Sequence, residues 1–427
     1  MRILTLGLTI IFCLNIGIAE AQNISDEQEW LIMVYMSGVN DLGILGYVDK
    51  NINAMESVKL TNEISVVVKY NGISSDKNEH LQFQGDSVKL HIQYDSDINR
   101  ISSPAFRSKY NSDMGDWKHL DRFAISNMLR FPAKKTMLVI WGQGEGHKGI
   151  AYDDVSSNKI TVNQLGLALE KIFKTTGRKL DIFATDASFM QMASVAHEIK
   201  DYAKVIVGSE ESIPGEGYPY KSILSDLNNN PEMDAKELGK IIVRDYGDYY
   251  SAKGIDISIV RNYGDYNNNG GTTISAVDAA LMPQFVILLD NWVNAITPKA
   301  DALKKVAKLS VDKNISYFGS FNIDKGKGTR SIDLCDFIDH IDNLLPDGSE
   351  AKKAGEILKN FMANNLIIAH RGTGTKRETS GSHNTQTCGL AVYMPKRIDS
   401  YYNELIFAKN SHWDDFIRSI LIILEGG

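Results

Sequence analysis

Short apolar runs recur along the first half of the chain, and each has the length of a buried β-strand. The runs are Trp30–Met36, Ile64–Lys69, Met137–Trp141, Leu180–Ala184 and Val205–Gly208. They are rich in Val, Ile and Leu, which is typical of strands buried on both faces of a sheet. The stretches between them carry apolar residues at helical spacing: Tyr47–Val58, Leu120–Arg130, Val162–Thr175 and Phe189–Tyr202. Strands that alternate with helices predict a mostly parallel sheet covered on both faces.

The second half of the chain is less regular. Ala276–Ile296, Ala351–Asn364 and Trp413–Leu424 have the pattern of helices, and Cys388–Met394 has that of a strand. Two polar stretches, Asn262–Gly271 and His370–Thr387, predict a linker and a mobile loop. We therefore expect a core over residues 22–261 and, over 262–427, a C-terminal part of the same unit.

The N-terminus has the pattern of a secretory signal. Arg2 precedes an apolar run, Ile3–Ile18, and the run is followed by Ala19-Glu-Ala21. The run is too short and too interrupted for a comfortable membrane span. We expect residues 1–21 to be removed and the mature chain to have no transmembrane segment. We expect this chain to be secreted or periplasmic, and a location at the cell surface is an open alternative.

The composition narrows the function classes. Of the 427 residues, 43% are apolar and 23% are charged, as in an ordinary folded soluble protein. Lys and Arg number 46 against 53 Asp and Glu, a net charge of −7. An acidic chain without a Lys/Arg-dense block is not typical of a general nucleic-acid binder, so we expect no nucleic-acid partner.

The cysteines do not indicate a disulfide framework. Cys13 lies in the predicted signal, which leaves Cys335 and Cys388 in the mature chain. We interpret these two as small buried hydrophobic residues, with a pairing between them left open. No Cys or His spacing indicates a zinc site, so we assign no metal-binding residues.

The loops after the predicted strands are where chemistry is expected, because ligands bind outside the carboxyl ends of parallel strands. The loop Trp141–His147 is Gly-rich, but no Gly-Lys-Ser/Thr follows to indicate a phosphate cradle. In Thr185–Phe189, Ser188 lies at a strand-to-helix turn, where spacing alone favours a helix N-cap over a nucleophile. The acidic loop Ser209–Tyr218, taken alone, is typical of a solvated surface.

Several ordered motifs nevertheless resemble one family. Asp186-Ala-Ser-Phe-Met190 is similar to Asp-Ala-Cys-Leu-Met, and Ile140-Trp-Gly-Gln-Gly-Glu-Gly146 to Leu-Trp-x-His-Gly-x-Gly, of the clostripain family of cysteine peptidases. Tyr35–Asp41, Glu210–Gly217, Ser331–Leu334 and Gly389–Pro395 match further stretches of that family. The family is related in fold to caspases, gingipains and legumain. The resemblance implies a three-layer α/β/α sandwich with a mostly parallel central sheet, caspase–haemoglobinase-like, plus a C-terminal extension.

The resemblance also identifies what is changed. The family's catalytic dyad is a His and a Cys, and the matching positions here are Gln143 and Ser188. In the family the thiolate attacks the scissile carbonyl, while the imidazole activates the thiol and protonates the leaving amine. A carboxamide cannot exchange a proton near pH 7, and a hydroxyl without a base is a weak nucleophile. We therefore predict a homologue that does not hydrolyse peptides.

Three explanations of the two changes remain open. We favour natural degeneration of the site. A relocated base, His147 serving Ser188, would instead give an active endopeptidase specific for Arg or Lys, although His147 is also explained as a surface loop residue. An engineered inactive form is the third, but trapping a peptidase normally needs only the Cys to change. A scaffold or interaction protein with an unused site is a further function.

The resemblance implies a pocket for Arg or Lys side chains, shaped by acids that correspond here to Asp186 and Glu216. The expected partner is a peptide or protein with exposed Arg or Lys; the opposing reading is that both acids are inherited without a ligand. Family members are often cleaved for activation after the His, where Lys159 lies here, but an inactive chain would not process itself. We expect no cofactor; calcium dependence is known in relatives, and no ligand set is assignable.

Overall fold

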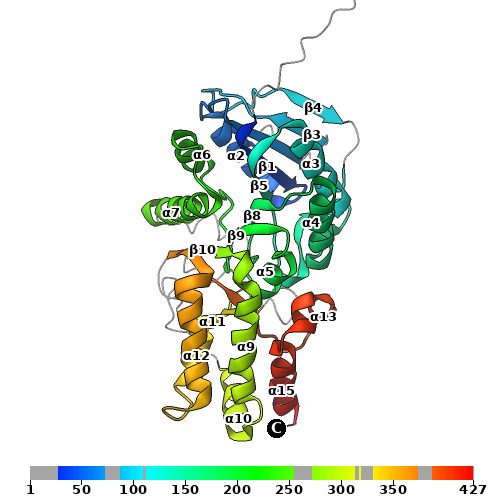
Figure 1. The fold of residues 1–427 in the computed structure, drawn as a ribbon. Helices are drawn as coiled ribbons and strands as arrows, with labels where there is room; N and C mark the ends of the chain where they lie inside the picture. Colours follow the sequence, from blue (N-terminus) through cyan, green and yellow to red (C-terminus); the bar gives the residue numbers. More distant parts are fainter. Residues whose placement is uncertain are drawn as a thin grey trace, which may run out of the picture.

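A nine-stranded mixed sheet forms the centre of the protein (Figure 1). The computed structural model describes residues 27–72, 87–108, 112–253, 272–312, 317–318, 330–373 and 387–426. In sheet order the strands are β12 (Ile367–Thr373), β10 (Thr272–Asp278), β9 (Ala203–Gly208), β8 (Leu180–Asp186), β5 (Ala133–Trp141), β1 (Gln28–Gly38), β2 (Ile64–Gly72), β3 (Ser87–His91) and β4 (Ala105–Ser108). The five strands from β9 to β2 are mutually parallel, which confirms the mostly parallel sheet.

Helices cover both faces of the sheet, which confirms the three-layer fold (Figure 1). One face carries α3 (Trp117–Arg130), α4 (Val162–Thr176) and α5 (Ala193–Ile199); the other carries α2 (Tyr47–Glu56), α6 (Tyr220–Asn229) and α7 (Ala235–Lys253). Alternate residues of β1 show why both layers are needed, because Met33 and Tyr35 enter one apolar core while Val34 enters the other.

The C-terminal part extends the sheet and adds a helical lobe. Strand β10 pairs with β9 on one side and with β12 on the other, both in the antiparallel sense. The lobe contains α9 (Met282–Ile296), α10 (Ala300–Leu309), α11 (Leu334–Asp342), α12 (Glu350–Phe361), α13 (Ser400–Glu404), α14 (Ile406–Asn410), α15 (Trp413–Glu425) and the antiparallel pair β11 (Ser331–Asp333) and β13 (Ala391–Tyr393). Its core includes Trp292 stacked on Trp413, with ring centroids 6.5 Å apart.

Several predicted boundaries are wrong. The stretch Ala276–Ile296 is not one helix, because its first three residues complete strand β10 and α9 begins at Met282. Strand β12 takes the first residues of the predicted loop His370–Thr387. In both cases pairing with a neighbouring strand overrides the local pattern. Residues 1–21, Asn262–Gly271 and the predicted loop from 374 to 386 lie outside the described residues.

One stretch of the described residues, Ala279–Ile296, is long and apolar enough to cross a membrane by length and composition. Its residues Phe285, Leu289, Trp292 and Val293 are fully buried in the core of the C-terminal lobe. This burial is typical of a core helix. The absence of a transmembrane segment stays a prediction.

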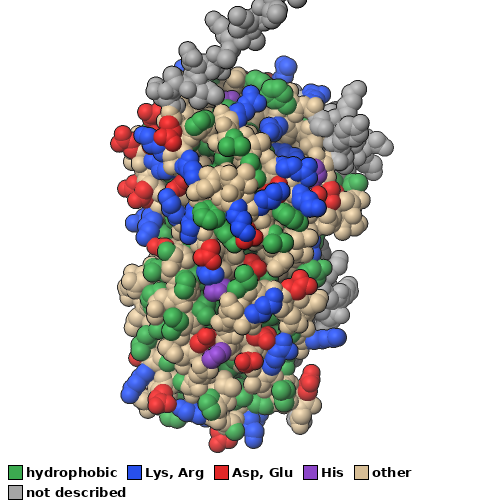
Figure 2. Space-filling model, turned by 45° about the vertical axis from the view of Figure 1, so that its right-hand side comes forward, with side chains coloured by type: hydrophobic (Ala, Val, Ile, Leu, Met, Phe, Trp, Pro, Cys, Tyr) green, Lys and Arg blue, Asp and Glu red, His purple; other side chains and the backbone are tan. Residues whose placement is uncertain are grey.

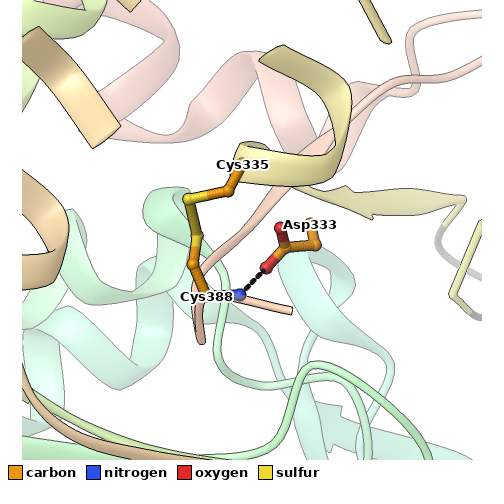
Figure 3. Close-up of side chains that lie close together, drawn as sticks. All are labelled: Asp333, Cys335 and Cys388. Carbon is orange, nitrogen blue, oxygen red and sulfur yellow. Dashed lines mark hydrogen bonds between the residues drawn. A yellow bond between two sulfur atoms is a disulfide. The ribbon is translucent and has the colours of Figure 1, made fainter. Parts of the chain in front are cut away.

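A disulfide joins Cys335 at the start of α11 to Cys388, with their Cα atoms 6.0 Å apart (Figure 3). The interpretation as two small buried hydrophobic residues is therefore wrong, and the pairing that the sequence left open is present. The residues are also only half-buried, and 53 positions separate them in the sequence. A separation of this length gives no local signal, since the fold alone brings the two segments together.

Candidate functional site

The candidate site lies at the carboxyl ends of the central parallel strands. In the pairing of β5 with β8, Trp141 lies opposite Asp186, the last residue of β8. The amide of Gly142 then donates to the carbonyl oxygen of Asp186 at 3.1 Å. The loops that follow the two strands therefore leave the same edge of the sheet together.

Gln143 is held by an acid that follows β1. Its Nε2 donates to Oδ1 of Asp41 at 2.5 Å. Asp41 begins the short helix α1 (Asp41–Ile44), which Asn40 caps by accepting from Leu42 N. Sequence reasoning did not single out Asp41, although its place directly after a central strand put it at the same edge. The carboxamide is thus fixed in orientation and offers no group that titrates near neutral pH.

Ser188 lies in a tight turn and does not cap the following helix. Helix α5 begins at Ala193 with Met192 as its N-cap, so the N-cap interpretation is wrong. The Oγ atom of Ser188 instead accepts from the amide of Ile213 at 3.0 Å. The next residue, Phe189, has a positive φ of 65°, a strained conformation for a bulky side chain. Such strain is typical of turns that present a side chain at a functional site.

The loop of Gln143 packs directly against the turn of Ser188. A Cβ atom on Gly144 would lie 2.4 Å from the carbonyl oxygen of Ser188 and 3.1 Å from Cβ of Ala187. Only glycine permits this approach. The structure therefore places the loop that carries Gln143 in contact with the turn that carries Ser188.

His147 lies in the short helix η1 (Gly146–Lys148) and points into the C-terminal part of the chain. Its side chain is fully buried, its Nε2 is 2.7 Å from Oδ2 of Asp399, and its ring lies 4.1 Å from that of Tyr393. Burial lowers the pKa of His147 despite the opposing effect of Asp399, so the neutral ring donates Nε2–H to the carboxylate. The interpretation of His147 as a surface loop residue is wrong.

Asp186 is a buried acid surrounded by tyrosines. Its Oδ2 accepts from Tyr218 N and from Tyr220 Oη, both at 2.9 Å. Its Oδ1 is buried and has no hydrogen-bond partner among the described residues. Burial raises the pKa of Asp186 to about 7, although these two hydrogen bonds act in the opposite direction. No cation of the described chain forms an ion pair with it.

Glu216 lies on the loop that closes over Asp186. The next residue, Gly217, has φ +67°, and a Cβ there would lie 2.6 Å from Oδ2 of Asp186. Glu216 is half-buried. Burial of Tyr47 raises the pKa of its hydroxyl, and the charge of Glu216 adds to this effect. The residue after Glu216 therefore lies against Asp186, and the ring of Tyr47, on α2, lies beside the same loop.

Lys159, at the family's activation segment, belongs to the hairpin of β6 (Ile150–Asp153) and β7 (Asn158–Ile160). Its ammonium group donates to Tyr152 Oη at 2.8 Å and lies 4.5 Å from the ring centroid of Tyr401. Glu145 is also within 3.7 Å of it. These contacts hold the segment against the Gly-rich loop and the C-terminal part.

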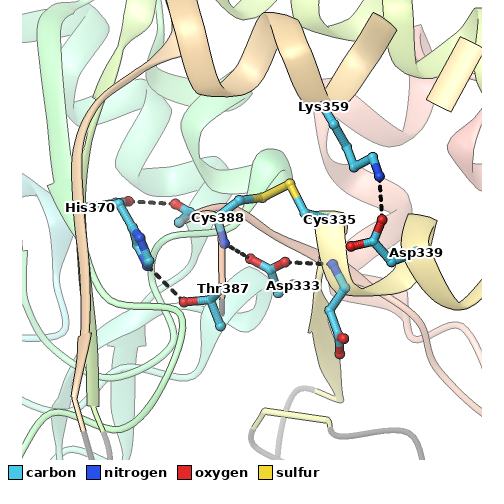
Figure 4. The surroundings of a disulfide bond; sticks show 10 residues. Asp333, Cys335, Asp339, Lys359, His370, Thr387 and Cys388 are labelled. Atoms are coloured by element: carbon cyan, nitrogen blue, oxygen red, sulfur yellow. Dashed lines mark hydrogen bonds and ion pairs between the residues drawn. A yellow bond between two sulfur atoms is a disulfide. The ribbon is translucent and has the colours of Figure 1, made fainter. Parts of the chain in front are cut away.

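One group of potential metal ligands occurs in the described residues: Asp333, Cys335 and Cys388, with ligand atoms within 4.8 Å of one another (Figure 3). Both sulfur atoms belong to the disulfide, so neither is a thiolate ligand. The carboxylate of Asp333 accepts from the amides of Asp336 at 2.9 Å and Cys388 at 2.7 Å (Figure 4). The group therefore acts as a link between segments rather than as a metal site.

The comparisons with known proteins agree with this geometry. A sequence model described as the clostripain family matches residues 34–420. A search of curated proteins finds no match.

Three solved structures are similar over almost their whole length. A secreted C11 cysteine protease from Bacteroides thetaiotaomicron, in complex with an irreversible peptide inhibitor, has a TM-score of 0.62 and 18% identity, covering 91% of this chain and 99% of that chain. An inactive zymogen C11 protease from Parabacteroides distasonis has a TM-score of 0.61 and 18% identity, with 90% and 99% covered. A further secreted C11 cysteine protease from Bacteroides thetaiotaomicron has a TM-score of 0.57 and 12% identity, with 92% and 99% covered. At these identities the likeness shows a shared fold.

The buried carboxyl of Asp186 should make stability depend on pH. Its pKa is about 7 in the folded chain, against about 4 for an unfolded Asp. The folded chain therefore holds a proton that the unfolded chain releases, and wild-type stability falls relative to Asp186→Asn as pH rises from about 4 to about 7. Denaturant midpoints at several pH values measure this, with Glu425→Gln at the exposed end of α15 as the control for lost charge. A difference between wild type and Asp186→Asn that is constant over this range would contradict the assignment.

Proposed function

Because the chain belongs to the clostripain family, we propose that it is a peptidase homologue that does not hydrolyse peptides and that binds segments carrying Arg or Lys. The observation that carries the first part is the environment of Gln143 and Ser188. The side chain at position 143 is an amide bonded to Asp41, and the hydroxyl at 188 accepts from a backbone amide. Neither contact supplies a base for the hydroxyl.

The energetic consequence of this environment is large. In well-studied hydrolases, loss of members of a nucleophile–base unit costs roughly 10⁴ to 10⁶ in rate. Gln143 donates its N–H to a carboxylate but cannot take the proton of Ser188 at any pH where the protein is folded. The contact between the two loops fixes their backbones, but a fixed position alone does not replace proton transfer.

An active enzyme using His147 has weaker support. The imidazole is buried, donates to Asp399 and packs against Tyr393. Its other nitrogen, Nδ1, is buried and has no hydrogen-bond partner among the described residues. To serve Ser188, the ring would have to leave this aromatic site and give up the bond to the carboxylate.

The proposed ligand follows from the uncompensated acid. Asp186 has one carboxylate oxygen without a partner among the described residues, at the end of a strand where ligands bind. A guanidinium or ammonium group would donate to this oxygen and would return Asp186 to its ionised form. Glu216, on the loop next to Gly217, would add a second, more exposed negative charge. Binding should therefore strengthen as pH rises through about 7.

We also propose that the chain is exported. The signal-like pattern of residues 1–21 supports export, and so does the Cys335–Cys388 disulfide, because disulfides persist in oxidising compartments. The similar structure from Bacteroides thetaiotaomicron is described as a secreted protease. Secretion or periplasmic location would bring the acidic site into contact with extracellular peptides.

Restoring the dyad should restore hydrolysis. We expect the double variant Gln143→His with Ser188→Cys to cleave a fluorogenic arginyl or lysyl peptide at least about 10³ times faster than either single variant, since nucleophile and base act as a unit. The two single variants are the matched controls. If the double variant is folded and remains as slow as the single ones, the two positions no longer form a catalytic arrangement. This result would contradict the explanation that the changes at positions 143 and 188 alone prevent hydrolysis.

Peptide binding should depend on Asp186. We expect wild type to bind a fluorescent arginine-containing peptide, and Asp186→Asn to bind it about tenfold more weakly, because a charge-assisted hydrogen bond is lost. Glu216→Gln should have a smaller effect, because that side chain is more exposed and better screened. Fluorescence polarisation at pH 8 measures both. Absence of binding by wild type would contradict the ligand and favour a scaffold with an unused site.

A further inference from the structure

The outer strands β2 and β3 carry two lysines directly opposite each other. In their antiparallel pairing, Lys69 lies opposite Lys89. The Cβ atoms of such a pair are about 5 Å apart, and like charges in this arrangement repel. Both side chains are half-buried. Burial, Lys89 and Arg122 together lower the pKa of Lys69 to about 8, against an opposing effect of Asp116.

Helix α3 adds further cations on the same side. The packing of Tyr35 against Phe123 of α3, and the position of Lys69 Nζ 5.7 Å from the Tyr35 ring centroid, place the lysine on the face that α3 covers. His119, Arg122 and Arg130 follow one another at spacings of three and eight residues, so they form one row along α3. Arg122 and Arg130 are about 12 Å apart along the axis.

The cations form two groups. Arg122 lies within electrostatic range of Lys69 and His119, and Arg130 within range of Lys89 and His91. Arg130 also lies 5.8 Å from the ring centroid of Phe106, an exposed aromatic residue on β4 that faces Lys89 in the sheet register. Lys and Arg side chains gather over the upper part of the surface in Figure 2.

Acids lie near this group of cations, since Asp113 and Asp116 act on His119, but in the described chain they do not pair with its two lysines. Comparable half-buried lysines elsewhere have partners: Lys135 is 3.0 Å from Glu29, and Lys148 is 3.0 Å from Glu145. Lys69 and Lys89 form no ion pair with any described residue. Asp116 acts on Lys69, but its carboxylate accepts from Lys118 N as the N-cap of α3.

We propose that Lys69 and Lys89, flanked by Arg122 and Arg130, form a binding site for sulfate or phosphate groups. A tetrahedral oxyanion has several acceptor oxygens and can accept from two ammonium groups at once, which would turn the Lys69–Lys89 repulsion into a bridge. Arg130, at the end of α3, would bind another such group on the same ligand. The same chemistry is offered by free inorganic anions and by a sulfated sugar chain. This site is independent of Asp186 and of the changed dyad.

Thermal melting of the full chain tests the site with inorganic sulfate and phosphate. At equal ionic strength, these anions should raise the wild-type Tm more than chloride does, because binding to the folded state stabilises it. Lys89→Gln and the double variant Lys69→Gln with Lys89→Gln should lose this difference. They should also melt above wild type in low-salt chloride, because the repulsion is gone, which shows that they are folded. Lys240→Gln, an exposed lysine of α7, is the matched charge control and should behave as wild type.

A labelled heparin oligosaccharide distinguishes the two sources of the anion. If the natural ligand is a sulfated chain, it should bind more tightly than inorganic sulfate, and the double variant should weaken it about tenfold. Response to inorganic anions alone would assign the site to a free anion. The proposal is overturned if sulfate and phosphate act no differently from chloride and heparin does not bind, or if the double lysine variant responds to them as wild type does.

Discussion

The parallel pairing of β5 with β8 is the constraint on which the site depends. Its register sets Trp141 opposite Asp186, so the next residues of both strands leave the sheet side by side. Gly144 then packs on the carbonyl of Ser188, and the amide of Gly142 donates to the carbonyl oxygen of Asp186. All of these contacts are made by backbone atoms, and the approach at Gly144 is possible because glycine has no side chain. The scaffold is therefore insensitive to which side chains stand at 143 and 188, and chemistry can be lost while the fold is kept.

Two regions of the described chain hold ionisable groups that have no ion-pair partner of opposite charge. Asp186 is buried with one oxygen unpaired, and Lys69 and Lys89 are opposed across two strands. Buried or crowded charges of this kind reduce stability unless a partner of opposite charge is present. Places where a sequence lowers the stability of its own fold are usually functional sites. The acid and the cations lie in different parts of the sheet, so they point to two ligands of opposite sign.

The sequence predicted the parts of the fold that local pattern determines. The central strands and the helices between them were found because their apolar runs are long and buried on both faces. The strands β3, β4 and β12, at or next to the edges of the sheet, were missed because they are short or only partly buried. The start of α9 was misplaced because β10 is stabilised by partners 67 or more residues away in the chain, a pairing that no local window contains.

The candidate site shows the same division. Family resemblance identified Gln143, Ser188, Asp186 and Glu216, and the structure brings the first two loops together. The groups that hold these side chains were not predictable: Asp399 lies 252 positions from His147, and Ile213 lies 25 positions from Ser188. The turn at Phe189 and the later start of α5 likewise depend on packing between loops.

The central claim is that Ser188 has no base. The most direct measurement is the steady-state turnover of an arginyl or lysyl peptide by the purified wild-type chain between pH 5 and pH 9. The account predicts a rate equal to the uncatalysed background at every pH. A saturable, pH-dependent turnover that disappears in Ser188→Ala would contradict it.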